Sequence, residues 1–111
     1  MKTLDTFGEI LRTLREENEM PLRKLAALLD IDQSTLSKIE RNERKANAEL
    51  ISKVSQIFKI DKKELHISFI SDKVAYDLLD EESSVDILKV AEEKIEYLKT
   101  KRDLLNGTNG K

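Results

Sequence analysis

Apolar residues recur at a helical spacing along most of the chain. Over Phe7–Leu14 they fall three or four positions apart, and Thr6 with Glu9 fits a capping box at the start of this segment. A second helix is predicted over Pro21–Leu29, because proline suits a first helical turn, where its missing N–H would be unpaired anyway. The apolar stripe of this second helix consists of Leu22, Leu25, Ala26, Leu28 and Leu29.

Three further helices are predicted in the first two thirds of the chain. Asp32 is a natural N-cap for a short helix over Gln33–Asn42, Asn47 opens a fourth helix, and the spacing of apolar residues predicts a fifth over Asp61–Asp80. With only 3 Gly and 1 Pro, the composition favours helices over turn-rich β structure. An all-α fold is therefore expected.

The last predicted helix, Val85–Leu105, has apolar residues spaced alternately by three and four, which is a heptad pattern. Arg102 occupies one position of this seam. The seam predicts a dimerising coiled coil, although a helix folded back on its own domain or a docking helix for another protein would show the same pattern. The predicted dimerisation residues are Leu88, Ala91, Ile95, Leu98 and Leu105.

Length and composition exclude several classes of protein. The 111 residues provide one domain, expected over residues 1–66, and a helical tail over residues 67–111 with a frayed end. The absence of cysteine and the single His66 exclude disulfides and thiol nucleophiles and disfavour a metal site, so no enzyme activity, metal or cofactor is expected. With no membrane span or signal peptide in the sequence, a cytoplasmic location is expected.

The third predicted helix has the features of a DNA-reading element. Two short helices joined by a tight turn let the second enter the major groove. Opposite the apolar side formed by Leu36 and Ile39 lie polar residues, and Gln33 at the amino-terminal tip can pair with adenine. Residues 33–45 carry a local charge of +2, whereas the whole chain carries −2. DNA contacts are therefore expected from this patch rather than from bulk charge.

The sequence resembles the Xre/Cro-type helix-turn-helix family of phage and bacterial transcriptional regulators. The resemblance covers about Phe7–Leu65 and is carried by the segments Leu11–Glu17, Met20–Ala26 and Ile31–Arg41, which read LRTLREE, MPLRKLA and IDQSTLSKIER. It implies a five-helix, lambda-repressor-like domain that binds double-stranded DNA as a homodimer on an inverted repeat, with the third helix in the major groove.

The same resemblance implies roles for individual residues. Gln33, Ser34 and Lys38 match the base-reading positions of the family, and Arg15 with Glu40 matches an ion pair that joins the first helix to the third. Together with the polar face of the third helix and the cations that follow it, the expected DNA-binding residues are Gln33, Ser34, Thr35, Ser37, Lys38, Arg41, Arg44, Lys45 and Asn47.

These features predict a sequence-specific transcriptional regulator, expected to be a homodimeric repressor that also controls its own operon. A controller of a DNA restriction or modification locus is the leading specific variant, from the similarity of the chain after the fifth helix to such regulators. The alternative is a protein-interaction module such as an antitoxin, in which the tail binds a protein partner.

Overall fold

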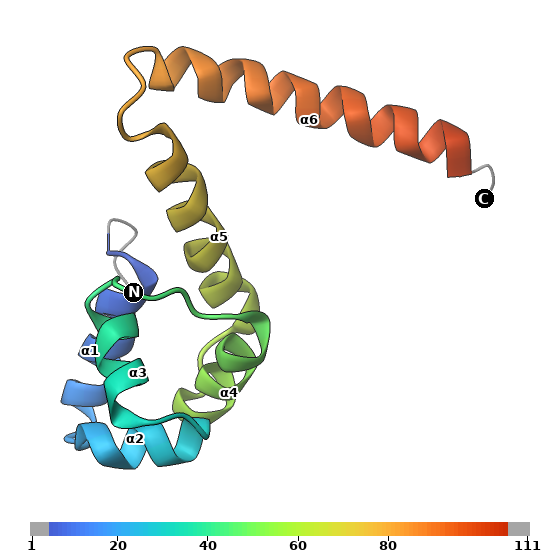
Figure 1. Ribbon diagram of the computed structural model, residues 1–111. Coiled ribbons are helices and arrows are strands. Elements are labelled where there is room, and N and C mark those ends of the chain that lie inside the picture. Colours follow the sequence, from blue (N-terminus) through green and yellow to red (C-terminus); the bar gives the residue numbers. More distant parts are fainter. Residues whose placement is uncertain (1–4, 107–111) are drawn as a thin grey trace. The chain divides into compact units, whose positions relative to one another are not determined.

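The computed structural model describes residues 5–106, which form six α-helices and no strand (Figure 1). This part of the chain confirms the all-α prediction, with a helix-turn-helix domain followed by a helical tail. It falls into two compact units, one ending at Ala75 and one beginning at Tyr76. The helices are α1 (Phe7–Glu17), α2 (Leu22–Leu29), α3 (Gln33–Glu40), α4 (Ala48–Phe58), α5 (Lys62–Leu78) and α6 (Ser84–Asn106).

The helix starts follow the predicted capping residues. The Thr6 hydroxyl accepts from the Glu9 N–H at 3.3 Å, while the Glu9 carboxylate accepts from the Thr6 N–H at 2.9 Å, which completes the capping box before α1. The Asp32 and Asn47 side chains cap α3 and α4 in the same way. Pro21 has an extended backbone and is the N-cap of α2, so this helix begins one residue later than predicted.

The end of α3 differs from the prediction. The helix stops at Glu40, with Arg41 as its C-cap, instead of continuing to Asn42. Asn42 adopts a left-handed backbone with φ of 63°, a conformation that asparagine tolerates better than most residues, and the Glu43 N–H donates back to the Lys38 carbonyl at 2.8 Å. This turn ends the helix and starts the loop that carries Arg44 and Lys45.

Helices α1 to α5 share one hydrophobic core. Leu28, which the apolar stripe of the second helix included, is an exception, since 48% of its side chain is exposed. The neighbouring Leu25 and Leu29 take up the buried side of α2. The buried apolar residues are Phe7, Ile10, Leu11, Leu25, Ala26, Leu29, Leu36, Ile39, Leu50, Ile51, Val54, Leu65 and Phe69.

Gly8 allows α1 to approach the end of α3 closely. It is buried, and a Cβ added there would collide with the Ile39 carbonyl oxygen and would lie 2.6 Å from Oδ1 of Asn42. The Ile39 carbonyl belongs to the backbone and has little freedom to move away. Glycine is therefore required here by close packing between two helices.

We expect the Gly8→Ala variant to be less stable than the wild type by about 1–3 kcal/mol, the usual cost of overpacking a core. Alanine would otherwise favour a helix interior by about 1 kcal/mol relative to glycine, so the sign of the change identifies the cause. Urea unfolding followed by circular dichroism measures it, with Thr13→Ala on the exposed side of α1 as the control. A stabilised Gly8→Ala protein would contradict the close approach.

The amino-terminal half of α5 belongs to the first compact unit. Phe69 packs edge-on against Phe7 with ring centroids 6.0 Å apart, and the Asp72 carboxylate accepts from the Phe7 N–H at 2.8 Å. The unit accordingly reaches Ala75, beyond the predicted domain boundary at residue 66. Helix α5 thus closes the core and holds the start of α1.

The second compact unit contains α6, whose residues are all outside the buried core of the described chain. The predicted frayed end, from residue 107 onward, lies outside the described residues. No helix within residues 5–106 is long and apolar enough to cross a membrane.

Candidate nucleic-acid interface

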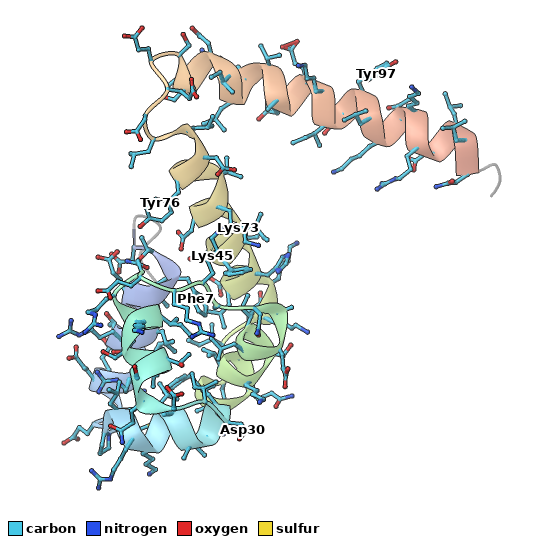
Figure 2. All side chains as sticks on the ribbon, in the orientation of Figure 1. Phe7, Asp30, Lys45, Lys73, Tyr76 and Tyr97 are labelled. Atoms are coloured by element: carbon cyan, nitrogen blue, oxygen red, sulfur yellow. The ribbon has the colours of Figure 1, made fainter. Side chains whose placement is uncertain are left out.

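A tight turn joins α2 to α3. Asp30 ends α2 with a left-handed backbone (φ 58°, ψ 45°), and the Ile31 N–H donates to the Ala26 carbonyl at 3.0 Å. Aspartate tolerates this conformation because its short polar side chain can bond locally. Figure 2 labels Asp30 at this turn. The chain therefore changes direction within three residues, and α3 begins immediately after Asp32.

Helix α3 buries one side and exposes the other. Leu36, Ile39 and Glu40 are buried, whereas Gln33, Ser34 and Lys38 are exposed. Thr35 and Ser37 lie between these extremes and are half-buried. At about 100° per residue, Ser34 and Lys38 project away from Leu36. The predicted base-reading side chains are thus brought together on the solvent side of α3.

The cations of this surface lie close to carboxylates. Arg41 is paired with Glu43 through Nε and Oε2 at 2.9 Å, and both side chains are about half exposed. The positive charges of Arg44 and Lys38 help to lower the pKa of the Asp32 carboxyl. Lys45, Arg41 and Arg44 are all exposed. The surface therefore exposes several cations whose charge is partly neutralised by its own carboxylates.

Asp32 caps α3, and its pKa is lower than that of an ordinary aspartate. Its carboxylate accepts from the Thr35 N–H at 2.7 Å, and this bond is the main cause that lowers the Asp32 pKa, with smaller contributions from Arg44 and Lys38. Because the pKa is lower in the folded protein, ionised Asp32 stabilises the fold above the pKa of the unfolded chain, about 3.9. That stabilisation is lost as the pH falls through the folded pKa.

We therefore expect the Asp32→Asn variant to be less stable than the wild type at pH 7, with a smaller difference at pH 2.5. Asparagine can still cap the helix, but it carries no charge to interact with the helix dipole or the neighbouring cations. Urea unfolding at the two pH values measures the difference. A gap of the same size at both would show that Asp32 acts by shape alone.

Asn47 occupies the start of α4. Its side chain is exposed, and its Oδ1 accepts from the Leu50 N–H at 2.8 Å. The amide nitrogen of Asn47 makes no hydrogen bond within the described residues and can donate to an approaching anion. The N-terminus of a helix also favours negative charge, so this position suits a phosphate.

An ion pair holds α3 against α1. Arg15 donates from Nε to Oε2 of Glu40 at 2.7 Å and from Nη2 to Oε1 at 3.0 Å, and its Nη1 donates to the Met20 carbonyl at 3.0 Å. These are the two residues expected to join the helices. Glu40 is only 6% exposed. The bond to Glu40 is the main cause that raises the pKa of Arg15, so the guanidinium keeps its charge and braces α3 from behind.

Comparison with known proteins identifies the family to which this arrangement of helices belongs. Residues 11–65 match the model of a family described as helix-turn-helix. They form a helix-turn-helix domain of the Xre/lambda-repressor-like family. The helix-turn-helix domain therefore spans all of α2, α3 and α4, and the family supports a DNA-binding regulator.

A solved structure resembles the helix-turn-helix protein over most of its length. This is the crystal structure of the clp gene regulator ClgR from Corynebacterium glutamicum, which is 20% identical, covers 88% of this chain and 90% of its own, and gives a TM-score of 0.52. At this identity the likeness concerns the fold alone. No curated protein sequence matches the chain.

Two contacts that support the helix-turn-helix surface were not predicted from the sequence. One is the glycine contact between Gly8 and the end of α3. The other is made by Lys53 of α4, whose Nζ donates to the Leu29 carbonyl at 3.2 Å. This hydrogen bond pairs a backbone carbonyl at the C-terminal end of α2. The isolated glycine on the buried side of an amphipathic helix was a usable signal for the first. The contact of Lys53 joins distant residues and has no local signal.

Proposed function

We propose that this protein is a sequence-specific transcriptional regulator that binds an inverted-repeat operator as a homodimer and represses by occupying a promoter. The observation that carries the proposal is the exposed polar and cationic side of α3, held from behind by Arg15 and Glu40 in a helix-turn-helix domain. A braced helix with short polar side chains is the kind of element that enters the major groove.

We assign the reading of bases to three side chains on this surface. The Gln33 amide can pair with N6 and N7 of adenine, and it lies at the amino-terminal tip of α3, which approaches the bases first. Lys38 can donate to O6 and N7 of guanine or to a phosphate. Ser34, between them on the exposed side, can donate to or accept from either kind of group.

Phosphate contacts complete the interface. Thr35 and Ser37 flank the base-reading residues, while Arg41, Arg44, Lys45 and Asn47 continue past the end of α3. Each phosphate contact releases about one counterion, so affinity should fall steeply with salt. Dimerisation through α6 is proposed to supply the affinity that a single, partly neutralised domain lacks.

The similar structure is that of a clp gene regulator, which supports regulation of genes as the role of the present protein. Control of a restriction or modification locus is the specific variant we favour, from the resemblance in sequence. The exposed apolar residues of α6 favour one alternative, in which the tail binds a different protein, as an antitoxin does.

Selection of bound duplexes from a random DNA pool, at two salt concentrations, tests the proposal and needs no known operator sequence. The expected product is an inverted repeat whose half-sites lie about one helical turn apart, recovered more weakly at the higher salt. Enrichment of single half-sites would exclude the dimer. Absence of enrichment at both salts would favour the protein-binding alternative.

A further inference from the structure

The seam of α6 is exposed in the described part of the chain and is available to a partner. Leu88, Ile95 and Leu98 are 46%, 50% and 57% exposed, and no residue of α6 enters the core of the described chain. Burying apolar side chains of this kind stabilises an association. Since the residues repeat as a heptad, the matching surface is another helix with the same repeat.

We propose that α6 pairs with α6 of a second copy of this chain in the antiparallel orientation. This rests on the homodimer of the proposed function and specifies how its two copies are joined. Leu88 then faces Leu105 of the second copy, Ile95 faces Leu98, and Arg102 faces Ala91, each pair occurring twice around the two-fold axis.

Packing in the seam favours this orientation over the parallel one. In a parallel pair each seam residue faces its own equivalent, so the two Arg102 guanidinium groups would be stacked against each other. The antiparallel pair separates these charges and places each long arginine side chain over the small Ala91 of the other helix. The remaining layers then consist of leucine and isoleucine only.

The charged residues beside the seam also favour the antiparallel orientation. The parallel pair brings Lys94 next to Lys99 of the second copy, which is repulsive on both sides. The antiparallel pair brings Glu92 next to Lys99 on one flank and Lys94 near Lys101 on the other, so one attractive contact accompanies each repulsive one. With the Arg102 layer included, the antiparallel pair carries less like-charge repulsion.

The antiparallel register also matches the geometry of DNA. With Leu88 facing Leu105, the two Ser84 residues that begin α6 lie about 37 Å apart along the axis, since a helix rises about 1.5 Å per residue. Half-sites in successive major grooves are about 34–36 Å apart. In a parallel pair the two starts would be only about 8–10 Å apart. The antiparallel pair thus separates the starts of its two α6 helices by a distance close to the half-site spacing.

Charge reversal at Lys99 distinguishes the two orientations by sign. In the full chain, Lys99→Glu should weaken dimerisation about three- to tenfold in sedimentation experiments, because the introduced carboxylate would face Glu92 of the second copy. Adding Glu92→Lys should restore the wild-type value. Lys89→Glu, on the outer side of α6, is the control and should have no effect. Stronger dimerisation of the Lys99→Glu protein would indicate the parallel pair and overturn the proposal.

Engineered cysteines test the register directly, because the natural sequence has none. Under mild oxidation, Leu88→Cys and Leu105→Cys should each stay uncrosslinked alone and form a disulfide when the two proteins are mixed. A disulfide within Leu88→Cys alone would overturn the orientation and leave the homodimer standing. A wild-type protein that sediments as a monomer with and without DNA would overturn both, while an operator recovered by selection would still support DNA recognition.

Discussion

Lys38→Glu is expected to reduce operator affinity at least about 100-fold, because a base or phosphate contact contributes about 1–3 kcal/mol and the dimer loses it twice. The new carboxylate would also face the phosphates of the groove and repel them. The fold should not change, since Lys38 is exposed and makes no contact with the core. Fluorescence anisotropy with the selected operator measures the loss.

The control for this variant is Lys89→Glu, which makes the same change of charge on the outer side of α6. Its affinity should stay close to that of the wild type, which shows that net charge does not explain the loss. Equal thermal melting of the Lys38→Glu and wild-type proteins shows that the domain is intact. Wild-type affinity in the Lys38→Glu protein would remove Lys38 from the interface.

Glu40→Ala is expected to destabilise the domain by about 3–5 kcal/mol, the usual effect of breaking a buried ion pair by removing one partner. The change leaves the Arg15 guanidinium, whose side chain is 15% exposed, without its carboxylate. The contact between α1 and α3 would be weakened at the same time, so DNA binding should fall together with stability. Urea unfolding at pH 7 provides the measurement.

Arg12→Ala on the same helix is the matched control for the buried pair. Arg12 and Glu16 also form a salt bridge, at 3.3 Å, but both side chains are more than half exposed. Removing such an exposed pair should cost at most about 1 kcal/mol. The Arg15→Ala, Glu40→Ala double variant should lose less than the sum of the single variants, because they share one interaction. Strict additivity would mean that the pair contributes nothing as a pair.

Much of the fold could be predicted from local sequence. The caps Thr6, Asp32 and Asn47 each accept from the backbone N–H group three residues further along, so short-range pattern suffices to locate them. The end of α3 depends on the turn at Asn42, and the burial of α2 depends on distant residues. The exposure of Leu28 and the requirement for Gly8 arise only when the helices pack against each other.

Part of the candidate site could also be predicted from the sequence. The angular position of Ser34 and Lys38 follows from the periodicity of α3, which separates them from Leu36. The pairing of Arg41 with Glu43 and the effect of Arg44 on Asp32 depend on the loop conformation after α3, which the periodicity does not contain. The heptad pattern of α6 could be recognised in the sequence. The solvent exposure of its apolar residues could be determined only from the structure.

The central claim is that α3 reads bases through Gln33, and a comparison of selected operators tests it most directly. Random duplexes are selected in parallel with the wild-type protein and with Gln33→Ala under the same salt conditions. The expected result is an inverted repeat in which the Gln33→Ala protein loses preference at one adenine-containing position in each half-site and keeps the spacing. An identical motif from both proteins would show that Gln33 does not read the operator and would contradict this claim.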